Sequence, residues 1–460
     1  LISEGDTLIR PHALLDFSGG SVAYQSGYIS TTQLVSQGQI YDIGDADPNR
    51  IYDGIVGHLQ KVFTRWNVTE HYQTPGATAM GRYEQGYVDG KAAGDLSIQT
   101  NNLLLQGDVQ GAAINGLLQR TPATQVNGGR LSIDLVSGRA ADSTTTQPVV
   151  FQSVQASTQV GLADPFPTQA DSPNESIPLS LPVDLYQRAG IHTADIKTSG
   201  AVRLEAGTQL NVDAAGSLSV QGGRQQIDGV IRAASATVKL TTQIPTTLTV
   251  DSAHPLDGSI TLGRQAGILA QGRWTNERPG LSDDPDLGPI FTQGGQINVT
   301  AQGNIDLMMG SRLDVSGGAL HRADSRVQSG DAGSITLRAA NDIGGQGSTL
   351  KVDGVMSGYA VQGGRSGTLS LASSEIIIDE GGHPVRPGGD TDPQPLILTP
   401  EFFRRGGFGR YSIESNKQGV TVDEGTRLDL RVANRLLDGA ATRWPTGTDL
   451  ATFSTVGYLP

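Results

Sequence analysis

The sequence predicts an all-β fold, a solenoid of the β-helix type, and three observations lead to that class. Apolar residues fall at every second position in short runs. Glycines separate the runs, and the same phrases recur along the chain. Because side chains alternate faces along a strand, each run has one buried and one solvated face. Residues 295–318 show the pattern best, with runs Ile297/Val299/Ala301, Ile305/Leu307/Met309 and Leu313/Val315.

Two phrases make up the repeat. The first reads Gly, any residue, apolar, Ser or Thr, apolar, and it opens at Gly94, Gly129, Gly216, Gly258, Gly333, Gly367 and Gly409. It also opens at Gly295, where Asn298 takes the place of Ser or Thr. The second reads Gly-Ser/Thr-x-Leu-x-apolar and begins at Gly207, Gly310, Gly347 and Gly425. From Gly216 onward the openings are roughly 40 residues apart, a period typical of solenoids whose units bury their dry faces by stacking. Each unit fits two coils of about 20 residues.

A propeller is the alternative, because its blades also have roughly 40 residues in four strands. It fits less well. The units carry neither a Trp-Asp signature nor regular Asn-Gly hairpin turns.

Composition narrows the class of protein. The 460 residues include 61 Gly, 5% aromatic residues and four Met, which predicts a thin aliphatic core. A net charge of −13 disfavours nucleic acid and anionic membranes as partners. Cysteine is absent, which excludes disulfides and thiolate chemistry, and no apolar run suggests membrane insertion. Leu1 begins no signal segment, so we expect a piece of a longer chain.

The repeat sets the expected domain organisation. We predict an irregular cap or side domain over 1–93, the first β-helix coils over 94–138, a Pro/Ser/Thr-rich excursion over 139–197, and β-helix with two inserts over 198–460. The inserts span 274–289 and 381–407. Six prolines between 148 and 182 mark the excursion, since proline cannot donate to a strand ladder. Within the cap, residues 55–63 have apolar residues at helical spacing and predict a helix.

The recurrent phrases resemble the coils of filamentous haemagglutinin-type exoproteins, the large adhesins of bacterial two-partner secretion. The opening segment is similar to a domain of unknown function found in some of these proteins. That similarity rests on Asp16-Phe-Ser-Gly-Gly-Ser-Val22, Gly27-Tyr-Ile29, and Tyr41-Asp-Ile43 through Asp45-Ala-Asp-Pro48.

The resemblance implies a right-handed parallel β-helix, a secreted or cell-surface location, and a role in adhesion. It also implies an outer-membrane transporter that exports the parent chain. The chain contains neither the Asn-Pro-Asn motif of the secretion domain nor the Val-Glu-Asn-Asn boundary of contact-dependent toxins. We therefore expect neither the export signal nor the toxin.

Acidic loops are the first candidates for chemistry. Asp283, Asp284 and Asp286 supply oxygen ligands of the kind that calcium prefers, as do Asp45/Asp47 and Asp390/Asp392. None follows the calcium nonapeptide pattern, so solvated loops are the simpler interpretation. A carboxylate pair for glycoside hydrolysis would need two acidic residues on neighbouring rungs, and the scattered candidates are Asp306, Asp314, Asp353 and Asp429. The seven histidines are dispersed without zinc-ligand spacing, and no cofactor is expected.

The predicted function is non-enzymatic: a rigid stalk in a bacterial adhesin, with loops that contact a receptor or glycan on a host or neighbouring cell. The partner-contact candidates are Asp283, Asp284, Asp286, Arg404 and Arg405. Two alternatives stay open. One is a β-helix polysaccharide lyase or hydrolase that uses surface carboxylates. The other is the stalk of a contact-dependent inhibition exoprotein.

Overall fold

The computed structural model divides the chain into two compact units. The larger unit contains Leu1–Gly20, Gly90–Asn115 and Gln119–Pro460, and the smaller contains Ser21–Asp89 and Gly116–Leu118. The residues that the structure describes are 1–29, 32–56, 58–73, 82–121, 123–136, 146–153, 166–169, 172–243, 257–278, 289–339, 348–380, 394–439 and 441–458.

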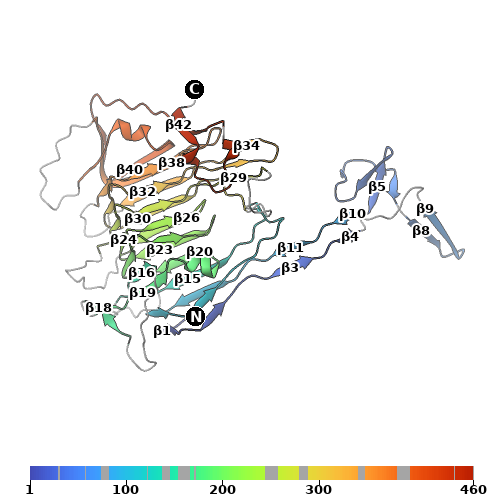
Figure 1. The fold of residues 1–460 in the computed structure, drawn as a ribbon, viewed down its shortest axis with the longest axis horizontal. Helices are drawn as coiled ribbons and strands as arrows, with labels where there is room; N and C mark the ends of the chain where they lie inside the picture. Colours follow the sequence, from blue (N-terminus) through green and yellow to red (C-terminus); the bar gives the residue numbers. More distant parts are fainter. Residues whose placement is uncertain are drawn as a thin grey trace. The chain divides into compact units, whose positions relative to one another are not determined.

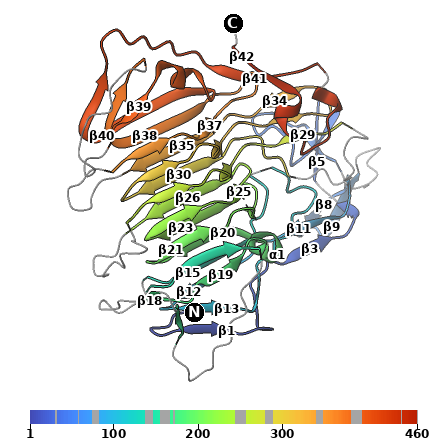
Figure 2. The same ribbon diagram turned by 60° about the vertical axis from the view of Figure 1, so that its left-hand side comes forward.

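Three parallel sheets form the larger unit, and Figures 1 and 2 show their strands stacked one above another. The first sheet contains β12 (Asp95–Gln99), β15 (Gly129–Asp134), β20 (Ile191–Lys197), β23 (Ser217–Gly222), β26 (Thr237–Thr242), β30 (Gln296–Ala301), β35 (Ser334–Ala339), β38 (Gly367–Ile378), β39 (Leu396–Leu398) and β40 (Phe408–Val422). The second contains β19 (Leu179–Pro182), β16 (Val149–Gln152), β21 (Ala201–Leu204), β24 (Arg224–Ile227), β27 (Ile260–Leu262), β31 (Ile305–Leu307) and β36 (Leu350–Val352). The third contains β22 (Gln209–Asn211), β25 (Val230–Arg232), β28 (Gly267–Leu269), β32 (Arg312–Asp314) and β37 (Val355–Ser357).

Successive strands along this part of the chain belong to the first, second and third sheets in turn. The chain passes through β23, β24 and β25, and the following strands β26, β27 and β28 lie beside them in the same sequence. Inward residues therefore stack in columns. One column of the first sheet aligns Ile98, Ile133, Ile196, Val220, Leu240, Val299, Leu337 and Leu371. All eight are almost fully buried, so the predicted alternation and the all-β parallel class are confirmed.

Small polar residues turn the chain between the first and second sheets. The hydroxyl of Thr100 donates to the Gly5 carbonyl, and the hydroxyls of Thr198 and Thr242 donate to the carbonyls of Gln147 and Gly258. These bonds add a second donor at the Gly5 and Gly258 carbonyls, which also accept from the N–H groups of Asn101 and Gly303. Glycine is required where stacked backbones meet: a Cβ on Gly333 would lie 1.7 Å from the Gly295 carbonyl oxygen.

The first residues belong to the stack and not to a cap. β1 (Thr7–Ile9) pairs in parallel with β13 (Leu103–Leu105), and β2 (Leu14–Asp16) pairs in parallel with β14 (Asp108–Gln110). The predicted irregular region over 1–93 is therefore wrong for its first twenty residues. Burial of Ile9 beneath Leu105 explains why the segment joins the stack.

The smaller unit consists of short antiparallel pairs. Its strands are β3 (Ser21–Tyr24) with β11 (Tyr87–Gly90), β4 (Gly27–Ile29) with β10 (Arg82–Glu84), β5 (Gln33–Ser36) with β6 (Gln39–Asp42) and β7 (Gly54–Val56), and β8 (His58–Phe63) with β9 (Val68–Gln73). The helix predicted over 55–63 is wrong. A turn at 64–67, with Asn67 at φ 49°, reverses the chain, and cross-strand pairing overrides the helical spacing.

The predicted excursion over 139–197 is also shorter than expected. Strands β16, β19 and β20 belong to the sheets, while β17 (Thr168–Gln169) and β18 (Ser172–Ser176) form a hairpin and α1 (Leu185–Ala189) is one short helix. The prolines are compatible with this pairing, because Pro148 and Pro178 precede strands and Pro182 ends one. Residues 137–145 and 154–165 lie outside the described part.

A second, smaller core lies beside the third sheet. β29 (Trp274–Asn276) pairs in parallel with β33 (Ala319–His321), which pairs with β34 (Val327–Ser329). The C-terminal segment adds β41 (Ala433–Leu437), η2 (Ala441–Arg443), η3 (Leu450–Thr452) and β42 (Ser454–Tyr458). Trp274, predicted to open a charged insert, is instead 1% exposed at the centre of this core.

The C-terminal end of the stack is only half covered. The 3₁₀ helix η1 (Pro400–Arg404) places buried Phe403 against Tyr411, whose hydroxyl donates to the Phe403 carbonyl. A further coil predicted at Leu428/Leu430/Val432 does not form, since these side chains are exposed and outside any strand. Met309 is also exposed, because β31 ends at Leu307 and a turn follows.

Candidate functional site

A groove of about 730 Å³ on the larger unit is the best candidate site. It crosses the outer face of the third sheet. The loop after β14 and the end of α1 line one part of it, and the segment after β28 and residues 446–450 line another. All of its lining residues belong to the larger unit.

The floor follows from the strand alternation. Leu210, Ile231, Ile268 and Leu313 point inward and are buried, so their neighbours Asn211, Arg232, Leu269 and Asp314 share one outward column. Asn211 and Leu269 are half-buried and Arg232 is exposed. The floor thus offers an amide, a guanidinium, a small apolar surface and a carboxyl group in a line.

Asp314 is the buried acid of the groove, 6% exposed. Burial raises the pKa of its carboxyl above the ordinary 3.8, while hydrogen bonds from Ser316 and the charges of Arg435 and Arg312 oppose the shift. The backbone N–H of Ser316 donates to Asp314 Oδ1 at 2.9 Å. This carboxyl is held within the fold and is poorly placed to attract a cation from solvent.

Three arginines supply the groove with donors. Arg232 uses its Nε to donate to Gln209 Oε1 at 2.9 Å, and the Arg435 guanidinium lies 5.5 Å from the Tyr359 ring centroid. Arg273 lies 5.8 Å from the Phe291 ring centroid. Burial lowers the pKa of Arg273, which stays charged because guanidinium titrates far above neutrality. Among the described residues, none of the three forms an ion pair within 4.0 Å.

The aspartates of the groove are already engaged. Asp213 Oδ2 lies 2.8 Å from His192 Nδ1, and its Oδ1 accepts from the Ala214 N–H. Asp449 caps η3 by accepting from the Ala451 N–H. Gln271 Oε1 is buried at the groove and has no hydrogen-bond partner within the described chain. The three guanidinium groups thus line a groove whose aspartates already accept hydrogen bonds within the fold.

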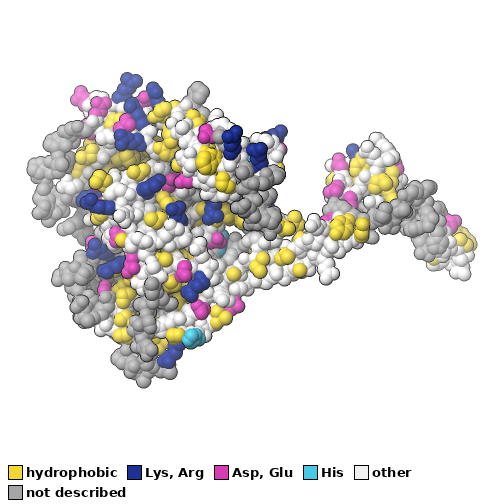
Figure 3. Space-filling view, in the orientation of Figure 1, with side chains coloured by type: hydrophobic (Ala, Val, Ile, Leu, Met, Phe, Trp, Pro, Cys, Tyr) yellow, Lys and Arg dark blue, Asp and Glu magenta, His cyan; other side chains and the backbone are white. Residues whose placement is uncertain are grey.

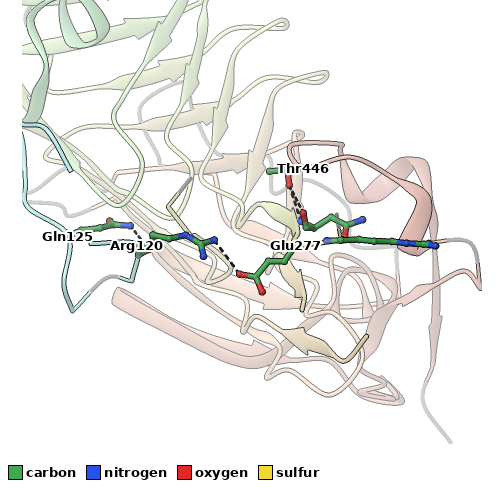
Figure 4. A network of polar contacts seen from close by, with 6 residues as sticks. Arg120, Gln125, Glu277 and Thr446 are labelled. Carbon is green, nitrogen blue, oxygen red and sulfur yellow. Dashed lines mark hydrogen bonds and ion pairs between the residues drawn. The ribbon is translucent and has the colours of Figure 1, made fainter. Parts of the chain in front are cut away.

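Figure 4 shows a network of polar contacts that reaches Thr446, one of the residues that line the groove. Arg120 Nη2 donates to Glu277 Oε1 at 3.2 Å, and Gln125 Nε2 donates to the Arg120 carbonyl. Beyond Glu277, the Asn276 N–H donates to Thr446 Oγ1 at 2.9 Å. The loop after β14, the end of β29 and the C-terminal segment are thereby joined, which holds this wall of the groove in place.

Asn276 continues this wall into the smaller core. Its Nδ2 donates to the carbonyls of Thr442 and Trp444, so its Oδ1 must accept from His321 Nδ1 at 3.0 Å. His321 Nε2 is buried without a partner within the described residues. The C-terminal segment is thus held by one fully buried amide as well as by Trp274.

The geometry of the groove does not fit a glycosidase carboxylate pair. Asp213 follows β22 and Asp314 ends β32, and three strand spacings of about 4.8 Å, roughly 14 Å, separate these strands. Glycoside hydrolysis needs its two carboxyl groups within about 9.5 Å. Elsewhere, Asp306 faces Lys351 across the second sheet, and Asp429 pairs with Arg404 and Arg431.

The structure places two of the five predicted contact residues. Arg404 lies 3.8 Å from Glu401 and 3.5 Å from Asp429, and Arg405 lies 3.5 Å from Glu401. The Arg404–Asp429 pair ties η1 to the segment around Asp429, whereas the Arg405–Glu401 pair is local to η1. Asp283, Asp284 and Asp286 lie outside the described residues, as do Asp390 and Asp392.

The other expected sites remain separate surface residues. Asp47 Oδ1 accepts from the Asn49 N–H, as in an ordinary turn. No group of three or more metal-ligating side chains occurs in the part of the chain that the structure describes. In that same part, no helix has the length and apolarity needed to span a membrane.

We predict that replacing Asp314 with asparagine has a pH-dependent effect on stability. The folded protein holds the Asp314 proton more tightly than the unfolded chain, so the free energy of unfolding falls as pH rises from 3.8 through the raised folded pKa. Asparagine does not titrate, so the free energy of unfolding of the Asp314→Asn variant lacks this pH-dependent decrease. The melting temperature of Asp314→Asn minus that of the wild type should become more positive between acidic and neutral pH, measured by circular dichroism. A constant or decreasing difference would show that burial does not control this carboxyl.

Sequence reasoning missed most of the groove. One signal was present: aligning the phrases at Gly207 and Gly310 puts Asn211 and Asp314 at the same outward position. Nothing local indicated Arg273 or Arg435, whose places depend on β29 and the C-terminal hairpin. No protein-family model matches the chain, and comparisons with curated proteins and with solved structures give no match.

Proposed function

We propose that this chain is a section of a right-handed parallel β-helix from an exported adhesin of the filamentous haemagglutinin type. In this proposal the stack is a rigid stalk, and the groove of the larger unit contacts a receptor or glycan on another cell. Location at the cell surface and export by an outer-membrane transporter are part of the same proposal.

The observation that carries the proposal is the in-register column from Ile98 to Leu371. Eight buried aliphatic side chains repeat at one position of consecutive parallel strands, and the strands visit three sheets in constant order. A stack of this kind transmits load through many equivalent ladders and grows by adding units. Inserts at its corners, such as β29 and the 21–89 segment, leave the ladders intact.

Two features favour binding over catalysis. Asp213 and Asp314 are too far apart for paired carboxylate chemistry, and each groove aspartate already accepts a hydrogen bond within the fold. Acidic and basic side chains also intermingle over the face shown in Figure 3. A mixed surface of this kind suits a soluble stalk whose specificity lies in one groove.

A glycan array on the purified chain, with and without calcium, tests the proposal. Every bound glycan is then incubated with the protein and assayed for new reducing ends and for unsaturated products. We expect binding without turnover. Turnover would overturn the non-enzymatic proposal in favour of a lyase or hydrolase, and binding only to a bacterial surface receptor would favour the stalk of a contact-dependent inhibition protein.

A further inference from the structure

We propose that the groove binds a carboxylate-bearing oligosaccharide laid across the strands of the third sheet, with Arg232, Arg273 and Arg435 as its anchors. This inference rests on the proposed binding function and names the chemical class of the ligand.

The three groove arginines form no ion pair with the described residues within 4.0 Å. Some arginines of the larger unit form ion pairs, as Arg338 does with Glu414 and Arg130 with Asp195. The remaining N–H groups of the groove arginines face a concave surface, which favours a ligand that brings its own anionic oxygens.

The acidic residues of the groove do not offset its preference for an anionic ligand. Asp213 has both oxygens engaged, by His192 and by the Ala214 N–H. Asp314 lines the floor but is 6% exposed, and it accepts from the Ser316 N–H. Asp449 is fixed as the cap of η3. Arg435 Nη1 donates to Ser454 Oγ at 3.4 Å, and the charges of Asp213 and Asp314 act on Arg273 and Arg435. An incoming carboxylate thus meets guanidinium groups with further N–H donors and acids that already accept hydrogen bonds.

The uncharged groups of the groove favour a saccharide over an acidic peptide as its ligand. Asn211, Thr446 and Thr448 line the groove with amide and hydroxyl groups. A densely hydroxylated ligand forms hydrogen bonds with such groups. The half-buried Leu269 is the apolar patch of the floor, too small to seat peptide side chains but suited to the C–H face of a sugar. Because β22, which carries Asn211, is an edge strand of the third sheet, an acidic peptide is the control ligand in the test.

The test is calorimetric titration of the full chain with hexagalacturonic acid. Two probes serve as matched controls: the fully methyl-esterified hexamer, which keeps the sugar backbone and removes the charge, and a hexaglutamate peptide, which keeps the charge and removes the sugar. We expect the acid to bind roughly tenfold or more tightly than either control, with affinity that falls as salt rises.

Variants assign the binding to the groove. Arg273→Gln and Arg232→Gln should each weaken the acid by about tenfold, as expected for loss of one charge-assisted contact. Arg203→Gln, an exposed arginine on the second sheet, should leave the affinity unchanged. Circular dichroism on each variant confirms that the fold is retained.

Each other outcome overturns the assignment. Equal affinity for the acid and its methyl ester would show that the arginines do not recognise the carboxylates. Equal affinity for the acid and hexaglutamate would show that the groove does not recognise the sugar. Absence of binding to hexagalacturonic acid, or binding that Arg203→Gln weakens equally, places the ligand elsewhere. If the array still reports glycan binding in those cases, the adhesin proposal survives without this inference. Turnover of the bound hexamer would overturn the non-enzymatic adhesin proposal but leave the ligand class intact.

Discussion

Replacing Leu313 with aspartate should destabilise the stack more than any other single change considered for this chain. Leu313 is 1% exposed and lies between Ile268 and Met356 of the neighbouring strands. Aspartate would bury an unpaired charge and leave a cavity, a combination expected to cost about 4 kcal/mol or more. The measurement is urea unfolding followed by circular dichroism.

Arg312→Gln is the matched control for this change. Arg312 precedes Leu313 in β32 and points to the opposite, exposed face. Its replacement should alter the free energy of unfolding by about 0.5 kcal/mol or less. If the two variants unfolded alike, the inward face assigned to β32 would be incorrect.

Replacing Trp274 with alanine should release the C-terminal segment from the stack. The Trp274 ring packs edge-on against Phe453 at 5.1 Å between centroids, and its Nε1 donates to the Trp444 carbonyl at 3.0 Å. Loss of a buried tryptophan typically costs about 3–5 kcal/mol. Because this core is separate from the columns of the three sheets, we expect rapid proteolysis and hydrogen exchange within 433–458 while the sheets remain protected.

Trp66→Ala controls for the loss of a tryptophan as such. Trp66 is 67% exposed at a hairpin turn and contacts Phe63. Its removal should change neither the protection of 433–458 nor the main unfolding transition. Unchanged protection in Trp274→Ala would mean that Asn276 and the β41–β42 hairpin hold the segment without the indole.

The Trp274→Ala variant also distinguishes the part of the groove that the C-terminal segment supplies from the part that the third sheet supplies. Arg435 and residues 446–450 reach the groove only through the C-terminal segment. Release of that segment in Trp274→Ala should therefore remove part of the groove wall while the outward column Asn211, Arg232, Leu269 and Asp314 stays in register. The same variant thus provides an independent test of whether the wall contributes to ligand affinity.

The sequence by itself determined the strands and their faces. Period-two alternation and recurring glycine phrases depend on local chemistry, namely which side chains leave water and where backbones must approach closely. Those rules located Leu218/Val220, Ile297/Val299 and Ile335/Leu337 correctly, all of them buried. They failed at residues 55–63 and at Leu428/Leu430, where cross-strand pairing in one case and the absence of a covering strand in the other decided the outcome.

Only the tertiary structure decided the groove. Trp274, Asn276 and Trp444 lie up to 170 residues apart, and no local pattern relates them. Their contact creates a second core that folds the C-terminal segment against β29, which carries Arg435 and Thr446 to the outward column of the third sheet. Alternation says that a side chain faces outward, but not which distant segment covers it. Long-range packing supplies that information, and it is why the parallel strands could be predicted from the sequence while the groove could not.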